Sequence, residues 1–394
     1  MEKTKIKFLY TRLCATAVFK EVLKTPLFKA FFEMMKEPSG EEKLLKYAAF
    51  AYEIYEDGGS LTKVCKKLVF EDENVYVKSR AAKREIDKNI VAAANRELET
   101  FSEFAALTPK DFAEETGADE KWLPAFTSEK VDFVGEYAKR MTELDKFGYG
   151  IFSSTAMFRL SDDKKIEPIL SADKIDMGTF IGYELERKKV VENTVAFLEG
   201  RPAANTLLCG DAGTGKSSTV KAVVNEFFEQ GLRLIELRKD QLGCIPRVMG
   251  QIRDNPLKFV IFIDDLSFNQ NDDNFSMLKA ALEGSAAARA DNAVIYATSN
   301  RRHIIKENFS DRDGDDVHRN DTLQETLSLS ERFGLVVSFS KPDKKLYLEI
   351  VKKLAERHGV KKEEKALEIE AEAFALKRGS RSARCAEQFI DSLL

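Results

Sequence analysis

The chain has 394 residues, of which 43% are apolar and 32% are charged, and its formal net charge is −4. These values are ordinary for a soluble globular protein of two or three domains, and the whole-chain charge gives no argument for nucleic-acid or membrane binding. Five cysteines are scattered without CxxC spacing, so we expect neither a zinc site nor a disulfide framework, and we expect a cytoplasmic location. The N-terminal apolar stretch is broken by Arg12 and lacks a cleavage site, and no apolar run is long enough to cross a membrane.

Residues 1–148 are predicted to form a mostly helical N-terminal domain. Thr108 followed by Pro109 indicates a helix start, with an N-cap residue and a proline at the first helical position. Trp122, the only tryptophan, is expected to pack in the core rather than to serve as a platform for a ligand. Residues 149–174 mix β-branched, aromatic and glycine residues, and we expect a linker there that can adopt an extended conformation.

Residues 175–341 alternate between strand-like apolar runs and helical segments, which predicts a parallel sheet with helices on both faces. The strand-like runs are 207–209, 232–237, 259–263, 293–297 and 335–339. Residues 342–394 are predicted to be helical and to form a small lid. The sequence therefore predicts an α/β protein with a three-layer αβα core and a parallel sheet, a C-terminal helical lid and an N-terminal, mostly α-helical domain.

A complete phosphate-binding loop follows the first of these strands. Its glycines let the backbone turn its N–H groups toward phosphate oxygens, at the N-terminus of the helix that begins here. Lys216 supplies a positive charge for the β- and γ-phosphates, and the Ser217 hydroxyl can bind Mg²⁺. The predicted nucleotide-binding residues of this Walker A motif are Gly210, Asp211, Ala212, Gly213, Thr214, Gly215, Lys216, Ser217 and Ser218.

Polar residues end two further strands of the predicted core. Asp264 and Asp265 follow the apolar run 259–263, as in a Walker B motif, and a buried parallel strand would deliver them to the sheet edge beside the loop. Asp264 is predicted to hold Mg²⁺ together with Ser217, and Asp265 to orient the attacking water. Asn300 follows the next apolar strand and is predicted to contact the γ-phosphate or that water.

With these motifs in place, the chain resembles the AAA+ P-loop ATPases. Asn300 stands where the first sensor lies in that family. The pair Asp264 and Asp265 is similar to the replication-initiator and helicase-loader branch, whereas most AAA+ proteins have Asp-Glu. Ile181 and Gly182, within Phe-Ile-Gly-Tyr, resemble the segment that lines the adenine pocket. The resemblance implies that ATP and Mg²⁺ bind here.

The same resemblance implies roles for two arginines. Arg332, within Ser-Glu-Arg-Phe-Gly, stands where an arginine finger acts in trans on a neighbouring subunit, which implies a homo-oligomer. The alternative is that Arg332 pairs with nearby acids. The segment 379–384 carries the second sensor arginine in the family, and helix-start spacing favours Arg384 over Arg381 for that position.

A closer resemblance is to the bacterial AAA+ family named domain of unknown function 815. Four segments carry it: Gly-Asp-Ala-Gly-Thr-Gly-Lys-Ser-Ser, Ile-Asp-Asp-Leu-Ser-Phe, Tyr-Ala-Thr-Ser-Asn-Arg-Arg-His and Ser-Leu-Ser-Glu-Arg-Phe-Gly. This resemblance covers residues 175–394 and is weak over the N-terminal helical part.

Several charged segments leave alternatives open. Two basic clusters in the N-terminal part are expected to be solvated faces, with nucleic-acid contact as the alternative: Lys63, Lys66 and Lys67, and Lys78, Arg80, Lys83 and Arg84. Three residues after the first sensor can contact phosphate, the adjoining subunit or solvent: Arg301, Arg302 and His303. A polar insert is expected to be a surface loop, with a cation site as the alternative, at Asp311, Asp313 and Asp315.

The sequence predicts an ATPase that converts ATP to ADP and phosphate and moves its lid against its core to act on an unidentified protein or nucleic-acid partner. Two alternatives stay open. One is a slow or non-hydrolysing ATP-gated binding switch, which the short side chain of Asp265 favours. The other is a helicase-loader-like DNA-associated ATPase, although no DNA-recognition motif is present. A small-molecule kinase fits less well because no acceptor-site motif follows the loop, and no membrane partner is expected.

Overall fold

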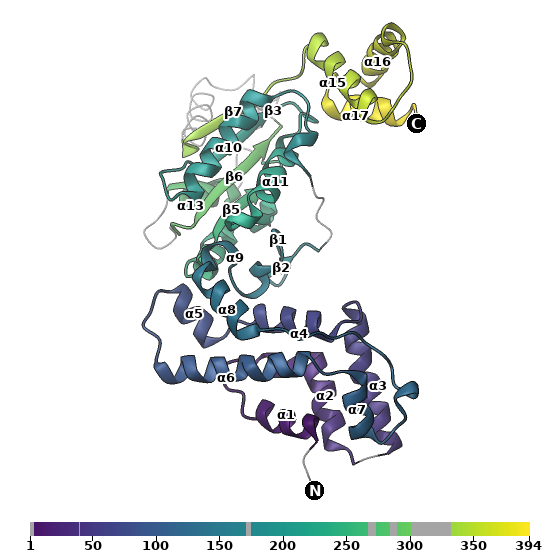
Figure 1. The fold of residues 1–394 in the computed structure, drawn as a ribbon. Helices are drawn as coiled ribbons and strands as arrows, with labels where there is room; N and C mark the ends of the chain where they lie inside the picture. Colours follow the sequence, from purple (N-terminus) through teal and green to yellow (C-terminus); the bar gives the residue numbers. More distant parts are fainter. Residues whose placement is uncertain (1–3, 39, 171–174, 267–272, 284–289, 301–331) are drawn as a thin grey trace. The chain divides into compact units, whose positions relative to one another are not determined.

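The structure is a computed structural model that describes residues 4–38, 40–170, 175–266, 273–283, 290–300 and 332–394. The chain divides into two compact units, Met1–Ser154 with Asp254–Pro256, and Thr155–Arg253 with Leu257–Leu394 (Figure 1). Each unit contains buried apolar clusters of its own, as expected of separate domains. Among the helices of the described ranges, none combines the length and the apolar composition needed to cross a bilayer.

The first unit is helical, as the sequence predicts, and aromatic rings fill much of its core. Phe28 stacks on Phe104 with the ring centroids 4.9 Å apart, and Phe31 meets Phe104 edge-on at 4.8 Å. Such rings bury a large apolar area and hold the helices together. The α-helices are α1 (Lys5–Leu13), α2 (Pro26–Lys36), α3 (Glu41–Glu56), α4 (Leu61–Phe70), α5 (Val75–Ala81), α6 (Lys88–Ala105), α7 (Pro109–Thr116), α8 (Phe133–Thr142) and α9 (Leu144–Phe147).

Helix α7 begins where the sequence predicts. The backbone N–H of Thr108 donates to Asp111 Oδ2 at 2.8 Å, which is half of a capping box, and Pro109 occupies the first helical position. The box satisfies an N–H group that the helix itself leaves without a partner. The predicted helix start at Thr108 is therefore confirmed.

Trp122 does not pack in the core, and that expectation is wrong. Its side chain lies in the single turn η2 (Glu120–Trp122) and is 73% exposed. The Lys121 ammonium lies 5.9 Å from the centroid of the indole ring, within cation–π range. Phenylalanine rings close the core instead, so a large apolar side chain at a surface turn has no interior position to occupy.

Two buried charged side chains fasten the helices of this unit. Glu97 on α6 is 7% exposed and accepts the backbone N–H groups of residues 17–19 at 2.9 to 3.1 Å. Lys43 on α3 is 3% exposed and donates to Glu115 of α7 at 2.6 Å. Buried charges need partners of this kind, because an unpaired one is strongly destabilising.

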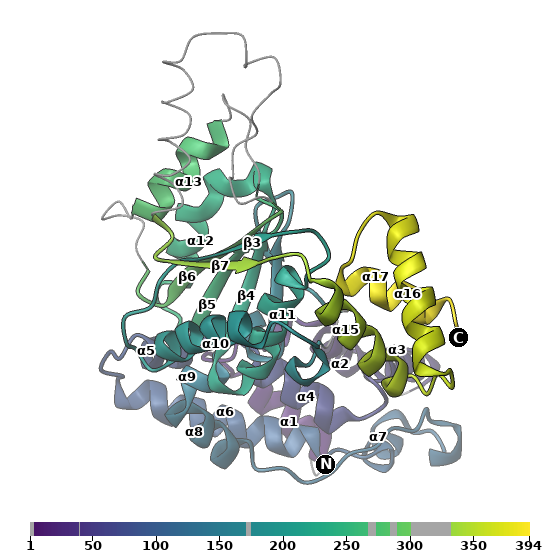
Figure 2. The same cartoon turned by 90° about the horizontal axis from the view of Figure 1, so that it is seen from above.

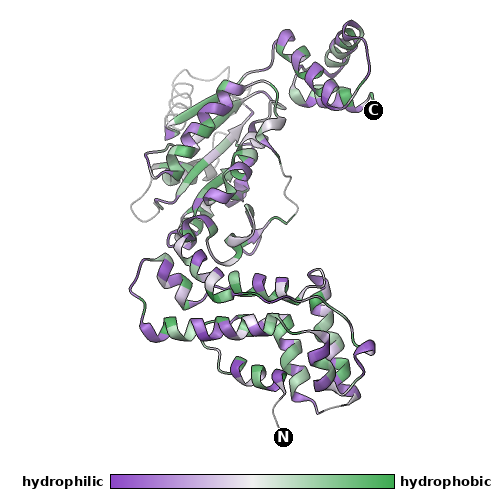
Figure 3. Ribbon diagram, viewed as in Figure 1, coloured by the Kyte–Doolittle hydropathy of each residue, from purple (hydrophilic) through white to green (hydrophobic). Residues whose placement is uncertain are grey.

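The second unit is built around a sheet with the strand order β2-β1-β4-β5-β6-β3-β7 among the described residues. All neighbouring strands run parallel except β1 and β2, which are antiparallel. Figure 3 shows apolar residues along these strands, as expected where helices cover both faces. The strands are β1 (Met157–Leu160), β2 (Ile166–Pro168), β3 (Thr206–Gly210), β4 (Leu232–Leu237), β5 (Lys258–Ile263), β6 (Ala293–Ser299) and β7 (Leu335–Phe339).

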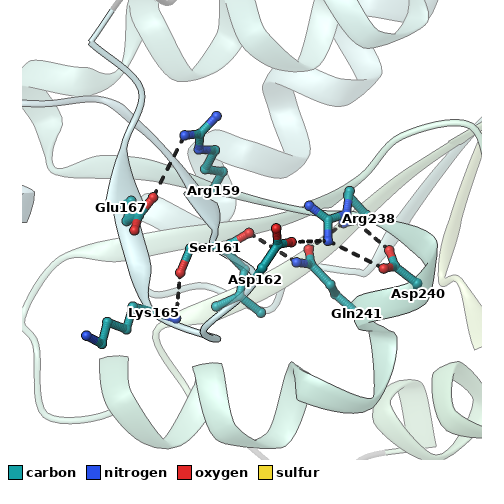
Figure 4. A network of polar contacts seen from close by, with 9 residues as sticks. Arg159, Ser161, Asp162, Lys165, Glu167, Arg238, Asp240 and Gln241 are labelled. Carbon is teal, nitrogen blue, oxygen red and sulfur yellow. Dashed lines mark hydrogen bonds and ion pairs between the residues drawn. The ribbon is translucent and has the colours of Figure 1, made fainter.

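The segment expected to be a linker supplies β1 and β2, the hairpin at one edge of the sheet (Figure 4). Gln241 Nε2 donates to the Leu160 carbonyl at 3.1 Å, and Arg238 Nη2 donates to Asp162 Oδ1 at 2.8 Å. These contacts fix the hairpin beside β4. Strands of four and three residues are too short to show a period in the sequence, which explains why the predicted core began only at residue 175.

Helices cover both faces of the sheet, so the predicted three-layer α/β core is confirmed. Figure 2 shows α10 (Glu184–Leu198) and α11 (Lys216–Glu226) on one side, and α12 (Ile245–Ile252) and α13 (Asp273–Glu283) on the other. A buried cluster joins α10 and α11 to the sheet. The short turns are η1 (Val22–Lys24), η3 (Gly150–Ser153), η4 (Met177–Thr179), η5 (Phe228–Gln230) and η6 (Lys239–Cys244).

Three helices after β7 form the predicted lid. They are α15 (Lys344–Arg357), α16 (Glu364–Arg378) and α17 (Ala383–Asp391), and they share a small buried core. Asp343 begins α15 by accepting the N–H of Leu346 at 2.7 Å, and Ser382 begins α17 by accepting the N–H of Cys385 at 3.1 Å. The strand order and the lid agree with the arrangement that the AAA+ resemblance implies.

Candidate functional site

The glycine-rich loop joins the buried strand β3 to helix α11, as the sequence predicts. Gly210 has a φ of +131°, and a Cβ atom there would lie 2.1 Å from the Phe339 carbonyl oxygen, so a side chain would not fit. Gly213 has a φ of +74°, and a Cβ there would lie 3.1 Å from Ser382 Oγ of the lid. The loop therefore packs tightly against β7 on one side and against the lid on the other.

A cavity of about 680 Å³ opens at the loop, where the helix N-terminus leaves N–H groups without helical partners. Its lining comes from the loop, the carboxyl ends of β5 and β6, the segment before α10, and the lid. Most of the predicted site residues meet there: Ile181, Ala212, Gly213, Thr214, Gly215, Lys216, Ser217, Ser218, Asp264, Asp265, Asn300 and Arg384.

Four predicted residues do not line this cavity: Gly182, Gly210, Asp211 and Arg332. The Asp211 carboxylate turns to the chain after β7 and accepts the N–H of Lys341 at 2.9 Å. Gly182 lies against Leu346 of the lid. These two residues and Gly210 therefore shape the walls of the site, while Arg332 lies outside the cavity of its own chain.

Lys216 is held at the floor of the cavity and is 5% exposed. Its ammonium donates to the carbonyls of Gly210 at 2.9 Å and Asp211 at 2.7 Å, and to Asn300 Oδ1 at 3.0 Å. Burial lowers the pKa of Lys216, while the nearby carboxylates of Asp211, Asp264 and Asp265 act in the opposite direction. Its ammonium therefore links the loop to a strand end, within the field of three carboxylates.

Asp264 and Asp265 stand at the end of β5, beside the loop. Ser217 Oγ donates to Asp264 Oδ1 at 2.6 Å, and Thr298 Oγ1 donates to the same oxygen at 2.5 Å. The backbone N–H of Asp265 donates to Thr298 Oγ1 at 2.9 Å and to Asp264 Oδ1 at 3.1 Å. Asp265 has a φ of +53°, in the left-handed region that non-glycine residues seldom adopt.

Asn300 bridges the basic and the acidic parts of the site. Its Oδ1 accepts from Lys216, and its Nδ2 donates to Asp265 Oδ1 at 2.7 Å. These groups therefore form one hydrogen-bonded chain, which runs from Lys216 through Asn300 to Asp265, and then through Thr298 to Asp264 and Ser217. A triphosphate would meet the two ends of this chain within one cavity.

The donor set fits a hard divalent cation. Ser217 and Asp264 offer a hydroxyl and a carboxylate oxygen 2.6 Å apart, and two carboxylates face one lysine ammonium at this end of the cavity. Mg²⁺ prefers oxygen ligands and is commonly held by one or two carboxylates plus substrate phosphates. Within the described residues, no group of three or more histidines, cysteines or acids is placed to hold a metal ion by itself.

The opposite end of the cavity contains residues that the sequence reasoning missed. Arg187 on α10 is 6% exposed, and its guanidinium carbon lies 4.9 Å from the centroid of the Phe180 ring. Burial lowers the pKa of Arg187. Ile350 and Leu354 of the lid add apolar surface to this end. Arg187 follows Phe-Ile-Gly-Tyr by one helical turn, and that spacing was the signal that could have found it.

The lid distinguishes the two candidate arginines near its last helix. Arg384 lines the cavity, and its backbone N–H donates to the Gly213 carbonyl of the loop at 3.3 Å. Arg381 instead forms a two-pronged pair with Glu372 of α16, at 2.9 and 2.8 Å. Of the two candidates, Arg384 is the one that the structure brings to the loop.

A further arginine of the lid also reaches the core. Arg357, in the last turn of α15, lines the cavity, and its Nη1 donates to the Thr179 carbonyl at 2.7 Å. The lid is therefore joined to the segment before α10 as well as to the glycine-rich loop.

Several predicted candidates lie outside the described residues. They are Arg301, Arg302 and His303 after the first sensor position, and Asp311, Asp313 and Asp315 in the polar insert.

Comparisons with known proteins yield similar structures and a family. A solved structure of the Thermotoga maritima RuvB Holliday junction branch migration motor matches 56% of this chain and 72% of its own, at 16% identity and a TM-score of 0.35. A proline-to-glycine variant of that protein matches at 18% identity, covering 56% of this chain and 73% of its own, also with a TM-score of 0.35. No curated protein matches the chain. A family model described as "Protein of unknown function (DUF815)" matches residues 153–394, more than half of the chain, so the chain belongs to this family.

Proposed function

We propose that this chain binds ATP with Mg²⁺ in the cavity at the glycine-rich loop and hydrolyses it to ADP and phosphate. One observation carries the proposal. A buried loop lysine, an asparagine and two aspartates are linked by hydrogen bonds in a cavity at a helix N-terminus. Such a site offers positive charge and free N–H groups to phosphates and carboxylates to a divalent cation.

The loop and Lys216 are proposed to hold the phosphates. Lys216 now donates to two backbone carbonyls and to Asn300, and phosphate oxygens would compete for the same three N–H donors. The base would lie at the other end of the cavity, where Ile181, Ile350 and Leu354 provide apolar contact. Arg187 beside the Phe180 ring would donate to an acceptor atom of the nucleotide.

Ser217 and Asp264 are the residues proposed to hold Mg²⁺, because their oxygens already meet. When bound, the cation supplies positive charge that offsets charge developing on the phosphates. Asp265 is proposed to accept the proton of the attacking water and to orient that water, and Asn300 fixes the carboxylate for this task through its amide at 2.7 Å.

Two arginines are proposed to sense the γ-phosphate. Arg384 reaches the cavity from the lid of the same chain, and closing the lid over the loop would bring its guanidinium toward the phosphates. Arg332 lies outside this cavity, so we propose that it acts on the site of a second copy of the chain. Hydrolysis would then change the fit between lid and core and move a bound partner.

A slow, ATP-gated switch is the second candidate, and a specific observation favours it. Asp265 is one methylene shorter than the glutamate usual in AAA+ proteins, and one of its carboxylate oxygens is already engaged by Asn300. The two candidates differ in one variant. In an ATPase, Asp265→Ala abolishes turnover and keeps nucleotide binding, whereas in a pure switch it changes neither partner affinity nor the already low turnover.

Phosphate release from ATP by the full chain with Mg²⁺ tests the main proposal. We expect steady release from the unmodified protein and a loss of about 100-fold or more in Lys216→Ala, because the loop loses its phosphate charge. Lys189→Ala is the matched control, since Lys189 is an exposed lysine of the same unit, and it should behave as the unmodified protein. Equal release by all three proteins, or none from the unmodified chain at high concentration, would overturn the proposal.

A further inference from the structure

We propose that Thr298 is a positioning residue that sets the orientation of both aspartates at the site. The proposal rests on the proposed nucleotide and Mg²⁺ site, and it adds a residue on β6 that neither the sequence motifs nor the family model assigns. Thr298 touches no phosphate in this proposal. It acts through Asp264 and Asp265.

Thr298 contacts both aspartates and the residue that follows them. It lies at the end of β6 and is 2% exposed. Thr298 Oγ1 donates to Asp264 Oδ1 at 2.5 Å and accepts the N–H of Asp265 at 2.9 Å. Its backbone carbonyl separately accepts the N–H of Leu266 at 2.6 Å. One residue thus holds the carboxylate of Asp264 and the backbone on both sides of Asp265.

The direction of each hydrogen bond follows from the chemistry of the groups. An ionised carboxylate can only accept, so the single proton of the Thr298 hydroxyl goes to Asp264. The hydroxyl then presents a lone pair to the N–H of Asp265. Because both sides of the hydroxyl are used, it can neither rotate freely nor exchange with water without breaking one of these bonds.

The backbone of Asp265 explains why such a fastening matters. Asp265 adopts a φ of +53°, which L-residues with a side chain disfavour and which surrounding contacts must enforce. In this conformation the Asp265 side chain meets Asn300 and its N–H meets Thr298. Without the hydroxyl, the N–H keeps its 3.1 Å contact to Asp264, and the backbone is freer to relax from the left-handed region.

The side chain can be tested apart from the strand, because the Thr298 carbonyl contact is made by the backbone. Thr298→Val keeps the shape and removes the hydroxyl, and Thr298→Ser keeps the hydroxyl and removes the methyl group. Thr194→Val is a matched control: Thr194 is fully buried, and its hydroxyl lies 2.8 Å from the hydroxyl of Tyr296 on β6, outside the cavity.

The experiment measures binding of a fluorescent ATP analogue to the full chain as Mg²⁺ is titrated, with phosphate release recorded in parallel. We expect Thr298→Val to raise the Mg²⁺ concentration for half-maximal effect by about fivefold or more, and to lower turnover by about tenfold, with nucleotide affinity in EDTA changed less than about twofold. Thr298→Ser should restore most of both, and Thr194→Val should change thermal stability alone.

The outcomes separate this inference from the proposed function. Mg²⁺-dependent binding that Thr298→Val leaves unchanged overturns the positioning role while the nucleotide site stands. An equal loss in Thr298→Ser also overturns it, because the hydroxyl would then be irrelevant. Absence of nucleotide binding by the unmodified chain overturns both, whereas binding without turnover still leaves the Mg²⁺ titration decisive. Should Thr298→Val fail to fold, Thr298→Ala replaces it under the same expectations.

Discussion

The two units of this chain bury charged side chains in different ways. In the first unit, the partners of Glu97 are backbone N–H groups of residues 17–19, which can leave only if the chain unfolds locally. In the second unit, the partners of Asp264 include the hydroxyls of Ser217 and Thr298, which rotate and can turn to a ligand. Burial of a charge alone therefore does not indicate function. The kind of partner does.

The buried lysines show the same difference. Lys43 donates to Glu115, whose other donors include Thr4 at 2.6 Å. Burial raises the pKa of Glu115, but the hydrogen bonds from Lys43 and Thr4 outweigh it, so the pKa of Glu115 is lowered overall. Lys216 donates instead to two carbonyls and an amide. A closed ion pair suits stability, and an ammonium facing a cavity suits an incoming anion.

Removing the buried charge of the first unit should produce the largest loss of stability. Glu97→Gln replaces one acceptor oxygen with an N–H₂ group that faces backbone N–H donors, so we expect a loss of about 3 kcal/mol in the free energy of unfolding. Urea unfolding followed by circular dichroism measures it. ATP affinity of the folded variant should stay within about twofold, and a loss of affinity without a loss of stability would break the comparison.

The lid arginines sharpen the comparison within the second unit. Arg384→Ala should lower the rate of ATP hydrolysis about tenfold, equal to about 1.4 kcal/mol, because position 384 then presents no guanidinium to the cavity. Arg381→Ala serves as the control, since Arg381 pairs with Glu372 within the lid, and we expect it to affect stability more than rate. The reverse order of rates would reassign the second sensor.

A smaller, pH-dependent effect is expected at Asp72 of the first unit. Burial raises the pKa of Asp72 to about 6, the hydrogen bond from Asn74 lowers it, and Glu21 and Glu73 raise it further while Lys78 opposes them. The folded state therefore keeps a proton that the unfolded chain loses near pH 4. The stability contribution is fully present below about pH 4 and declines as the pH rises toward 6.

Asp72→Asn copies the protonated form and should remove this decline. We expect the variant to match the unmodified protein near pH 4 and to be more stable by about 1 kcal/mol at pH 7. Thermal unfolding midpoints measured across that range provide the check. Among the described residues Asp72 Oδ2 is buried without a hydrogen-bond partner, so a destabilised variant at pH 7 would contradict this account.

Contiguous motifs explain what the sequence could predict. The loop from Gly210 to Ser217 and the pair Asp264 and Asp265 each follow an apolar strand, and the carboxyl ends of parallel strands meet at one edge of a sheet. The meeting of Lys216 with Asn300, 84 positions apart in the sequence, follows from that rule. Local spacing also predicted the start of α7, because a capping box lies within a few residues.

Isolated residues explain what the sequence could not predict. Thr298 and Arg187 gain their roles from partners elsewhere in the chain, and neither stands in a recurring pattern. The strands β1 and β2 are stabilised by pairing with their neighbours rather than by any periodicity of their own. Trp122 was misjudged because residue type alone does not tell which side of a turn faces the core.

Isothermal titration calorimetry of ATP into the full chain with Mg²⁺ tests the central claim most directly. We predict saturable heat at about one nucleotide per chain, a marked loss of affinity when Mg²⁺ is removed, and the same loss in Asp264→Asn even with Mg²⁺ present. No heat from the folded, unmodified chain, or identical titrations for both proteins, would contradict a nucleotide and cation bound between the glycine-rich loop and β5.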